Sequence, residues 1–182
     1  MLPSCSSYHP KETVAKDGTP VPGKVQNAPL FEWHGSGVTG PARVTINLSE
    51  QKAHIYKGGQ QVGWTYVATG VQEHRTPTGH FNIMEKIVDK RSNIWGIMVD
   101  GNGNTVNGNA HNGVSSVPGG GHFVGAPMPH WMRLTGYGVG MHGGPIPHPG
   151  SPASHGCIRL PYNMATYLYE ALPEGTSVTI VN

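Results

Sequence analysis

The stretch from which the fold and chemistry of this chain follow is Ser154-His155-Gly156-Cys157-Ile158-Arg159-Leu160, with His142-Gly143 upstream. Cys157 is one of 2 cysteines and lies among glycines, prolines and histidines, not within an apolar run. A structural cysteine usually lies in an apolar segment, whereas a reactive one requires a nearby imidazole to become a thiolate. Because His142 and His155 are both within sequence reach, the stretch predicts a cysteine/histidine nucleophile site.

The composition favours a β protein with many loops. Only 12% of the 182 residues are charged, and the chain holds 27 glycines and 16 prolines. The hydrophobic content of 36% falls in a regular alternation, which argues against disorder. The net charge of +2 and the lack of a basic cluster indicate no nucleic-acid partner, and no apolar run is long enough to span a membrane.

Residues 1–40 are expected to form an extended N-terminal arm, and residues 41–182 a single catalytic domain, because the first segment is rich in proline and has no sustained periodicity. Leu2-Pro3-Ser4-Cys5 resembles the end of a bacterial lipoprotein signal, although the charged and apolar regions that precede such a cysteine are absent. Two interpretations of Cys5 stay open: a signal remnant whose lipid would anchor the protein to a membrane, or an accidental match. A disulfide between Cys5 and Cys157 is a less favoured interpretation, because it would consume the only candidate nucleophile.

Alternation with a period of two predicts a series of short strands in the second segment. In chain order these expected strands cover residues 43–48, 53–57, 62–69, 80–84, 128–141 and 178–180. One helix is expected after Cys157, because apolar residues recur with helical spacing from Met164 to Leu172. Pro161 suits its first turn and Pro173 ends it, so Cys157 should lie just before a helix N-terminus, where the helix dipole favours a thiolate.

Residues 100–125 are rich in Gly, Asn, Ser and Pro and are expected to form a long lid loop without secondary structure. The opening Asp100-Gly101-Asn102-Gly103-Asn104 is similar to a calcium-binding loop. However, Thr105 stands at the sixth position, where such a loop has glycine, and His111 at the twelfth, where it has glutamate. Calcium is therefore not expected there.

A cysteine that attacks a carbonyl needs a base, a group that orients the base, and donors for the oxyanion. His142 is the candidate base. The carbonyl of Gly143 is its candidate partner, because no acidic residue lies nearby in sequence. The backbone N–H groups of Gly156 and Cys157 are the candidate oxyanion donors, since glycine lets the chain approach a substrate closely.

The rest of the motif supplies further candidates for oxyanion and substrate binding, namely Ser154, His155, Gly156 and Arg159. His155 either forms a hydrogen bond within the loop or assists proton transfer. Arg159 has a planar guanidinium that suits a substrate carboxylate, and the alternative is that it ties loop carbonyls together. Trp131 and Tyr137 are expected in the core or in a cleft wall.

A zinc site is the competing chemistry. Its ligands would come from His142, His148, His155 and Cys157. Their spacing matches no compact pair of the HxxxH or CxxC kind, so no metal and no cofactor are expected.

The motif closely resembles the signature of L,D-transpeptidase (YkuD-type) catalytic domains. Three further segments, at residues 43–51, 76–81 and 127–132, are similar to that family's opening strand, its Thr-Pro-Thr-Gly turn and the segment before the catalytic strand. The resemblance covers roughly residues 41–182. It implies a mainly β fold, a β-sandwich of mixed sheets with the helix packed at one side.

The resemblance also implies an activity. Cys157 would attack the peptide bond after the third residue of a peptidoglycan stem tetrapeptide, with His142 as base and Gly143 orienting it. D-alanine would leave, and the thioester would pass to an amine on a second stem, giving a 3-3 cross-link. Two alternatives stay open: an L,D-carboxypeptidase that uses water as acceptor, and a non-catalytic peptidoglycan-binding module.

The implied partners are donor and acceptor stem peptides in the bacterial cell envelope, and carbapenems should acylate Cys157. The implied location is periplasmic or otherwise extracytoplasmic, in peptidoglycan synthesis and the maintenance of cell shape. Members of the family often carry a separate peptidoglycan-binding module, and residues 1–40 are too short and irregular to form one.

Overall fold

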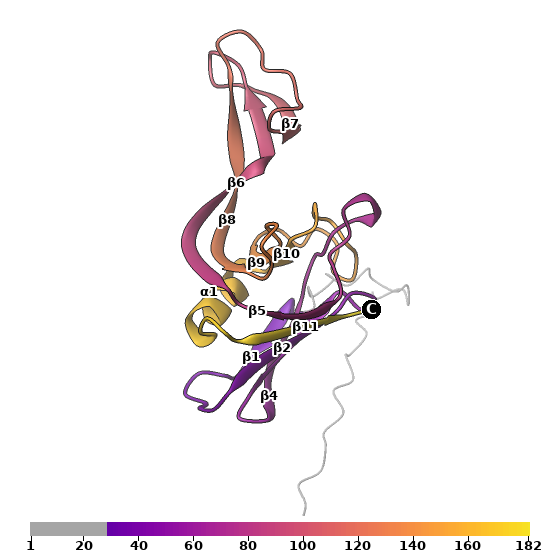
Figure 1. The fold of residues 1–182 in the computed structure, drawn as a ribbon, viewed down its shortest axis with the longest axis vertical. Coiled ribbons are helices and arrows are strands. Elements are labelled where there is room, and N and C mark those ends of the chain that lie inside the picture. The colour runs from indigo at the N-terminus through magenta and orange to yellow at the C-terminus, as the bar shows by residue number, and fades with distance from the viewer. Residues whose placement is uncertain (1–28) are drawn as a thin grey trace, which may run out of the picture.

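A computed structural model describes residues 29–182, which form two β-sheets and one α-helix (Figure 1). The strands of the first sheet are β1 Phe31–Trp33, β2 Ala42–Asn47, β3 Lys52–Lys57, β4 Gln60–Tyr66, β5 Gly79–Asn82 and β11 Ser177–Val181. They lie side by side in the order β1-β4-β3-β2-β11-β5, and only the β2–β11 pair is parallel. Each strand that the sequence predicted within residues 43–84 and 178–180 is present in this sheet.

The strands of the second sheet are β6 Glu85–Val99, β7 Thr105–His111, β8 His122–Arg133, β9 Gly140–Gly143 and β10 Ile158–Leu160. Their order is β10-β9-β8-β6-β7, and the β9–β10 pair is parallel. The helix α1 spans Tyr162–Ala171, and a short 3₁₀ helix, η1, spans Gln72–His74. The expected mainly β fold with mixed sheets and one principal helix is thus confirmed.

The core lies where the first sheet meets β9, β10 and α1. Alternate residues of β2 and β3, such as Val44 and Ile55, are buried against Met141, Ile158 and Leu168. The side chains between them face outward, which is the consequence of the period of two in the sequence. This packing against the first sheet and α1 holds β9 and β10 in place.

Three expectations about the chain's organisation differ from the structure. Residues 31–33, placed within the N-terminal arm, form β1 and pair with β4, so the folded domain begins before residue 41. Residues 100–125, expected to lack secondary structure, contain β7 and the start of β8, and in Figure 1 these strands extend with β6 away from the body of the protein. The helix does not follow Cys157 directly, because β10 lies between them.

Cys5, the candidate lipidation site, lies outside the described residues. Within residues 29–182, no helix combines the length and the apolar character that crossing a membrane requires.

Lys86 joins β6 to the C-terminal end of α1. Its ammonium donates hydrogen bonds to the carbonyls of Tyr169 and Leu172, the latter at 2.8 Å, and lies 4.4 Å from the centroid of the Tyr169 ring. These carbonyls are among those that a helix leaves without partners at its C-terminus. Burial lowers the pKa of Lys86 and the charge of Glu174 opposes this effect, so the contact has a desolvation cost.

Replacing Lys86 with methionine should lower the free energy of unfolding by about 1–2 kcal/mol, because the carbonyls lose a charged donor. Chemical denaturation of the two proteins measures the difference. Lys57→Met, at the end of β3, is the control for loss of one positive charge. Equal denaturation midpoints for Lys86→Met and the wild type would contradict the prediction.

Candidate active site

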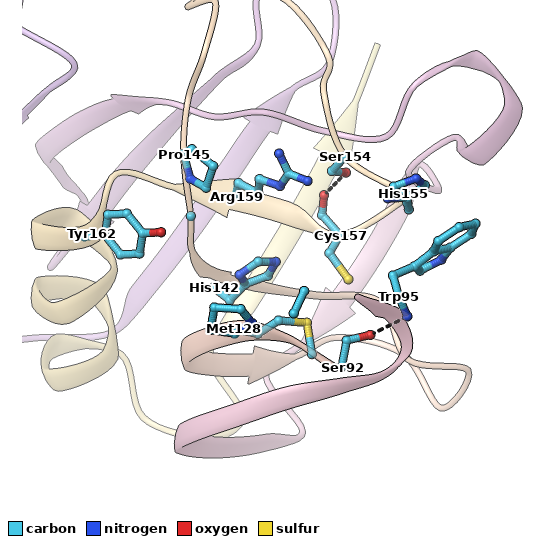
Figure 2. Close-up of a pocket in the computed structure, with 13 residues that line it drawn as sticks. Ser92, Trp95, Met128, His142, Pro145, Ser154, His155, Cys157, Arg159 and Tyr162 are labelled. Atoms are coloured by element: carbon cyan, nitrogen blue, oxygen red, sulfur yellow. Dashed lines mark hydrogen bonds between the residues drawn. The ribbon is translucent and has the colours of Figure 1, made fainter. Parts of the chain in front are cut away.

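The parallel pair β9–β10 brings the candidate nucleophile and base to one face of the sheet. Ile158 pairs with Met141, and Arg159 pairs with His142. Ile158 and Met141 are fully buried in the core, so the alternation along both strands turns His142 and Arg159 to the opposite face. Cys157 precedes Ile158 and shares that face, and in Figure 2 its sulfur and the His142 ring turn toward the same space.

The His142 ring is held in one orientation. Only 6% of the residue is exposed, and Nδ1 lies 2.9 Å from the carbonyl oxygen of Gly143. Because a carbonyl only accepts, Nδ1 carries the proton and Nε2 is the basic nitrogen of the neutral ring. Burial lowers the pKa of His142 from 6.5 to about 4; the Gly143 hydrogen bond opposes this and the Arg159 charge adds to it. His142 is therefore neutral at pH 7 and able to accept a proton.

The Cys157 thiol is also neutral at rest. Burial raises the pKa of Cys157, and the Gly140 N–H and the Arg159 charge offset only part of this effect. The thiol donates a weak hydrogen bond to the Gly138 carbonyl at 3.6 Å. Burial disfavours the charged form and β10 separates Cys157 from the helix N-terminus, so both oppose the preference for a thiolate that the helix dipole was expected to give. Proton transfer to a base would have to accompany attack.

Internal hydrogen bonds shape the loop that carries Cys157. The Ser154 hydroxyl accepts a hydrogen bond from the Gly156 N–H at 3.1 Å and donates one to the Cys157 carbonyl. Gly156 has a φ of +113°, a conformation that glycine adopts without strain. The Gly156 N–H, expected as an oxyanion donor, is therefore already engaged, and Ser154 serves the loop. The Cys157 N–H remains as the candidate oxyanion donor of this loop.

A bulge in β6 forms one wall of the site. Arg91 pairs with Pro127 and Gly96 with Gly125, so residues 92–95 lie opposite Ala126 alone. The Ser92 hydroxyl accepts hydrogen bonds from the N–H groups of Ile94 and Trp95, at 3.2 and 2.9 Å, which closes the bulge.

Trp95 from this bulge stacks on His155 of the motif, with ring centroids 3.9 Å apart and planes 12° from parallel. His74, at the end of η1, packs against both rings, and its ring centroid lies 5.2 Å from the centroid of each. Burial lowers the pKa of His155, as do the charges of His74 and Arg159. The described residues give His155 packing contacts and no hydrogen bond, so its position favours a role in holding Trp95 over one in proton transfer.

Arg159 is a half-buried cation without a carboxylate partner among the described residues, where the one ion pair joins Arg133 to Glu85. Burial lowers the pKa of Arg159. Its side-chain stem packs against Gly144. Its guanidinium makes no hydrogen bond to loop carbonyls, so the carboxylate-binding alternative is the better supported of the two.

These residues surround a cavity of about 370 Å³. Its walls include Trp95, Met128, His142, Ser154, His155, Cys157, Arg159 and Tyr162. A second cavity is also lined by Trp95, His155 and Cys157, and its other lining residues include Trp131 and Tyr137, which were expected in the core or in a cleft wall. Cys157 therefore lines two cavities, which suits a group that meets two substrates.

The sequence did not point to Ser92, Trp95 or Tyr162 as site residues. The sequence of β6 carries no signal for the bulge, because polar residues run unbroken from Asp89 to Asn93 and Ser92 does not stand out among them. His148, one of the four candidate zinc ligands, is exposed and does not line the Cys157 cavity. Residues 29–182 contain no group of three or more His, Cys, Asp or Glu side chains suited to hold a metal ion.

The lowered pKa of His142 predicts a loss of stability in mild acid. Between the unfolded value of 6.5 and the folded value of about 4, the unfolded chain binds a proton that the folded protein does not. The contribution of His142 to the free energy of unfolding is fully present above pH 6.5. It should be lost as the pH falls toward 4, which lowers the free energy of unfolding by roughly 3 kcal/mol at most. Denaturation of the wild type and His142→Ala across this range measures it. Parallel curves for the two proteins would contradict the assignment.

A family model described as the L,D-transpeptidase catalytic domain (YkuD) matches residues 41–180. No curated protein matches the chain by sequence. Among solved structures, an L,D-transpeptidase from Mycobacterium smegmatis is similar with a TM-score of 0.60 at 18% identity, over 78% of this chain and 58% of the other.

Two further solved structures are similar. A cysteine-to-serine variant of the Enterococcus faecium L,D-transpeptidase gives a TM-score of 0.57 at 23% identity, over 78% of this chain and 50% of the other. L,D-transpeptidase 3 from Mycobacterium tuberculosis, with a faropenem-derived adduct, gives 0.56 at 20% identity, over 78% and 60%. The chain thus spans 50% to 60% of the length of these three solved chains. At these identities the likenesses establish the fold.

Proposed function

Because the chain belongs to the L,D-transpeptidase (YkuD) catalytic-domain family, we propose that it forms 3-3 cross-links between peptidoglycan stem peptides through a thioester on Cys157. The observation that carries the proposal is the geometry of His142, whose Nδ1–H donates to the Gly143 carbonyl and whose neutral ring shares a cavity with the Cys157 thiol. This arrangement supports Cys157 as the nucleophile and His142 as an oriented general base.

In the first half-reaction, His142 Nε2 takes the thiol proton as Cys157 Sγ attacks the carbonyl carbon of the third residue of a stem tetrapeptide, which is joined to the terminal D-alanine. The oxygen becomes an oxyanion, for which the Cys157 N–H is the candidate donor. The carbon–nitrogen bond then breaks, and the imidazolium returns its proton to the amine of the leaving D-alanine. The product is a thioester on Cys157.

In the second half-reaction, an amine of a second stem attacks the thioester carbonyl and loses a proton to His142. The carbon–sulfur bond breaks, and the thiolate regains that proton. The two cavities that Cys157 lines support a donor stem in one and an acceptor stem in the other. Arg159 would bind a carboxylate of a stem peptide, because its half-buried charge has no carboxylate partner within residues 29–182.

Further aspects belong to the same proposal. Residues 41–182, together with β1, form the catalytic domain. The protein acts outside the cytoplasm, where peptidoglycan is assembled, and β-lactams of the carbapenem and penem classes acylate Cys157.

Mass spectrometry of products from purified disaccharide-tetrapeptides tests the function. A 3-3 cross-linked dimer together with free D-alanine would support transpeptidation. Tripeptide alone would make the protein an L,D-carboxypeptidase, and binding without any product would make it a peptidoglycan-binding module.

A further inference from the structure

Thr76 lies next to the loop that carries Cys157 but outside the cavity around the thiol. It comes from the Thr-Pro-Thr-Gly segment after η1 and is 4% exposed. Its hydroxyl donates to the carbonyl of Gly156 at 2.8 Å and accepts from the N–H of Gly70 at 2.9 Å. A threonine hydroxyl has one proton to donate, and here Gly156 receives it.

The segment that holds Thr76 is packed backbone to backbone against the loop. A Cβ added at Gly70 would lie 2.9 Å from the Cα of Gly156 and closer still to the carbonyl oxygen of His74. The N–H of Val71 donates to the carbonyl of Ser154, which ties the same two segments together. The loop therefore has little freedom to shift as a whole. Within it, the Thr76 hydroxyl donates to a single peptide group.

That peptide group joins Gly156 to Cys157. No cis peptide bond occurs in residues 29–182, so its C=O and N–H point in opposite directions within one plane. A hydrogen bond that fixes the Gly156 carbonyl on the Thr76 side consequently fixes the Cys157 N–H on the other side. Donation to the carbonyl also polarises the peptide group, which makes its N–H a stronger donor.

We propose that Thr76 is a positioning residue for the oxyanion donor: its hydroxyl orients and polarises the Gly156–Cys157 peptide so that the Cys157 N–H faces the developing oxyanion. This rests on the proposed acyl transfer at Cys157. The Gly156 N–H is engaged by Ser154, so the Cys157 N–H is the one of the two candidate oxyanion donors that is left, and its direction matters correspondingly.

The test compares two reactions of the same thiol. Acylation by faropenem passes through an oxyanion: Cys157 Sγ bonds to the lactam carbonyl carbon, the ring carbon–nitrogen bond breaks, and the thiol proton passes through His142 to that nitrogen. Alkylation by iodoacetamide displaces iodide and forms no oxyanion. Thr76→Val keeps the shape of the side chain and removes its hydroxyl, whereas Thr76→Ser keeps the hydroxyl.

We expect Thr76→Val to slow acylation by about 10- to 100-fold while alkylation stays within about 2-fold of the wild type. Thr76→Ser should acylate within about 3-fold of the wild type. Equal slowing of both reactions in Thr76→Val would show a merely structural role, and unchanged acylation would show no role; either overturns the inference. If Thr76→Val does not fold, Thr76→Ala replaces it, and acylation by Thr76→Ser as slow as by Thr76→Ala overturns the inference as well.

The result separates this inference from the proposed function. A wild type that accepts the faropenem acyl group but makes nothing from stem peptides overturns the function, and the comparison of variants still decides on Thr76. p-Nitrophenyl acetate serves as a second acyl donor. A wild-type thiol that accepts an acyl group from neither compound overturns both.

Discussion

Replacing Cys157 with alanine should abolish D-alanine release from stem tetrapeptides, with a loss on the order of 10⁴-fold or more. The thiol of Cys157 is the one thiol that lines the cavity among residues 29–182, and the proposed thioester cannot form without it. Cys157→Ser places a hydroxyl at the same position and should be nearly as inactive, because a hydroxyl is a much poorer nucleophile than a thiol beside the same base. Release of D-alanine is measured alongside the mass of the peptide products.

The domain should stay folded in both variants. Cys157 is half-buried on the cavity face, and the core residues Ile158 and Leu160 that anchor β10 are unchanged. Circular dichroism melting provides the check. Turnover retained by folded Cys157→Ala would overturn the nucleophile assignment, and loss of the fold in both variants would identify a structural cysteine.

Replacing His142 with alanine should lower kcat by about 10²- to 10⁴-fold, the range typical of a lost general base. His148→Ala removes an exposed histidine from the loop between β9 and β10 and serves as the control. KM should change little, since the neutral ring contributes mainly to proton transfer and not to binding. An active His142→Ala enzyme would contradict the assignment of the base.

The pH profile offers a second measurement on His142. A general base acts in its neutral form, and the pKa of His142 is lowered to about 4 by burial. The acid limb of kcat/KM should therefore fall near pH 4 instead of near pH 6.5, and the wild type should keep its activity at pH 5.5. Loss of activity with a midpoint near 6.5 would mean that another histidine is the base.

Much of this molecule follows from local sequence. The alternation at Val44 and Ile46 predicts β2, because a strand presents every second side chain to the core. The helical spacing of Met164 and Leu168 predicts α1 for the corresponding reason. The expected base and its Gly143 partner are adjacent in sequence, so their contact of 2.9 Å was within reach of sequence reasoning.

The misjudged elements depend on long-range pairing. Residues 105–111 are rich in Asn and Gly and have no strand signal, yet they form β7 because they pair with β6. The bulge at residues 92–95 exists because β8 supplies only Ala126 opposite it, a mismatch that the sequence of β6 alone does not contain.

The sequence by itself determined the mainly β fold and the candidate pair of Cys157 and His142, since these follow from residue types, spacing and periodicity, and the resemblance of its motif indicated the family. Tertiary structure alone decided that this pair is neutral, because burial sets the pKa values and burial is a property of the packed molecule. It also decided which N–H remains free for an oxyanion and brought Thr76 to Gly156, 80 positions along the chain. Contacts between residues so far apart in sequence depend on how the sheets pack, so no local sequence pattern predicts them.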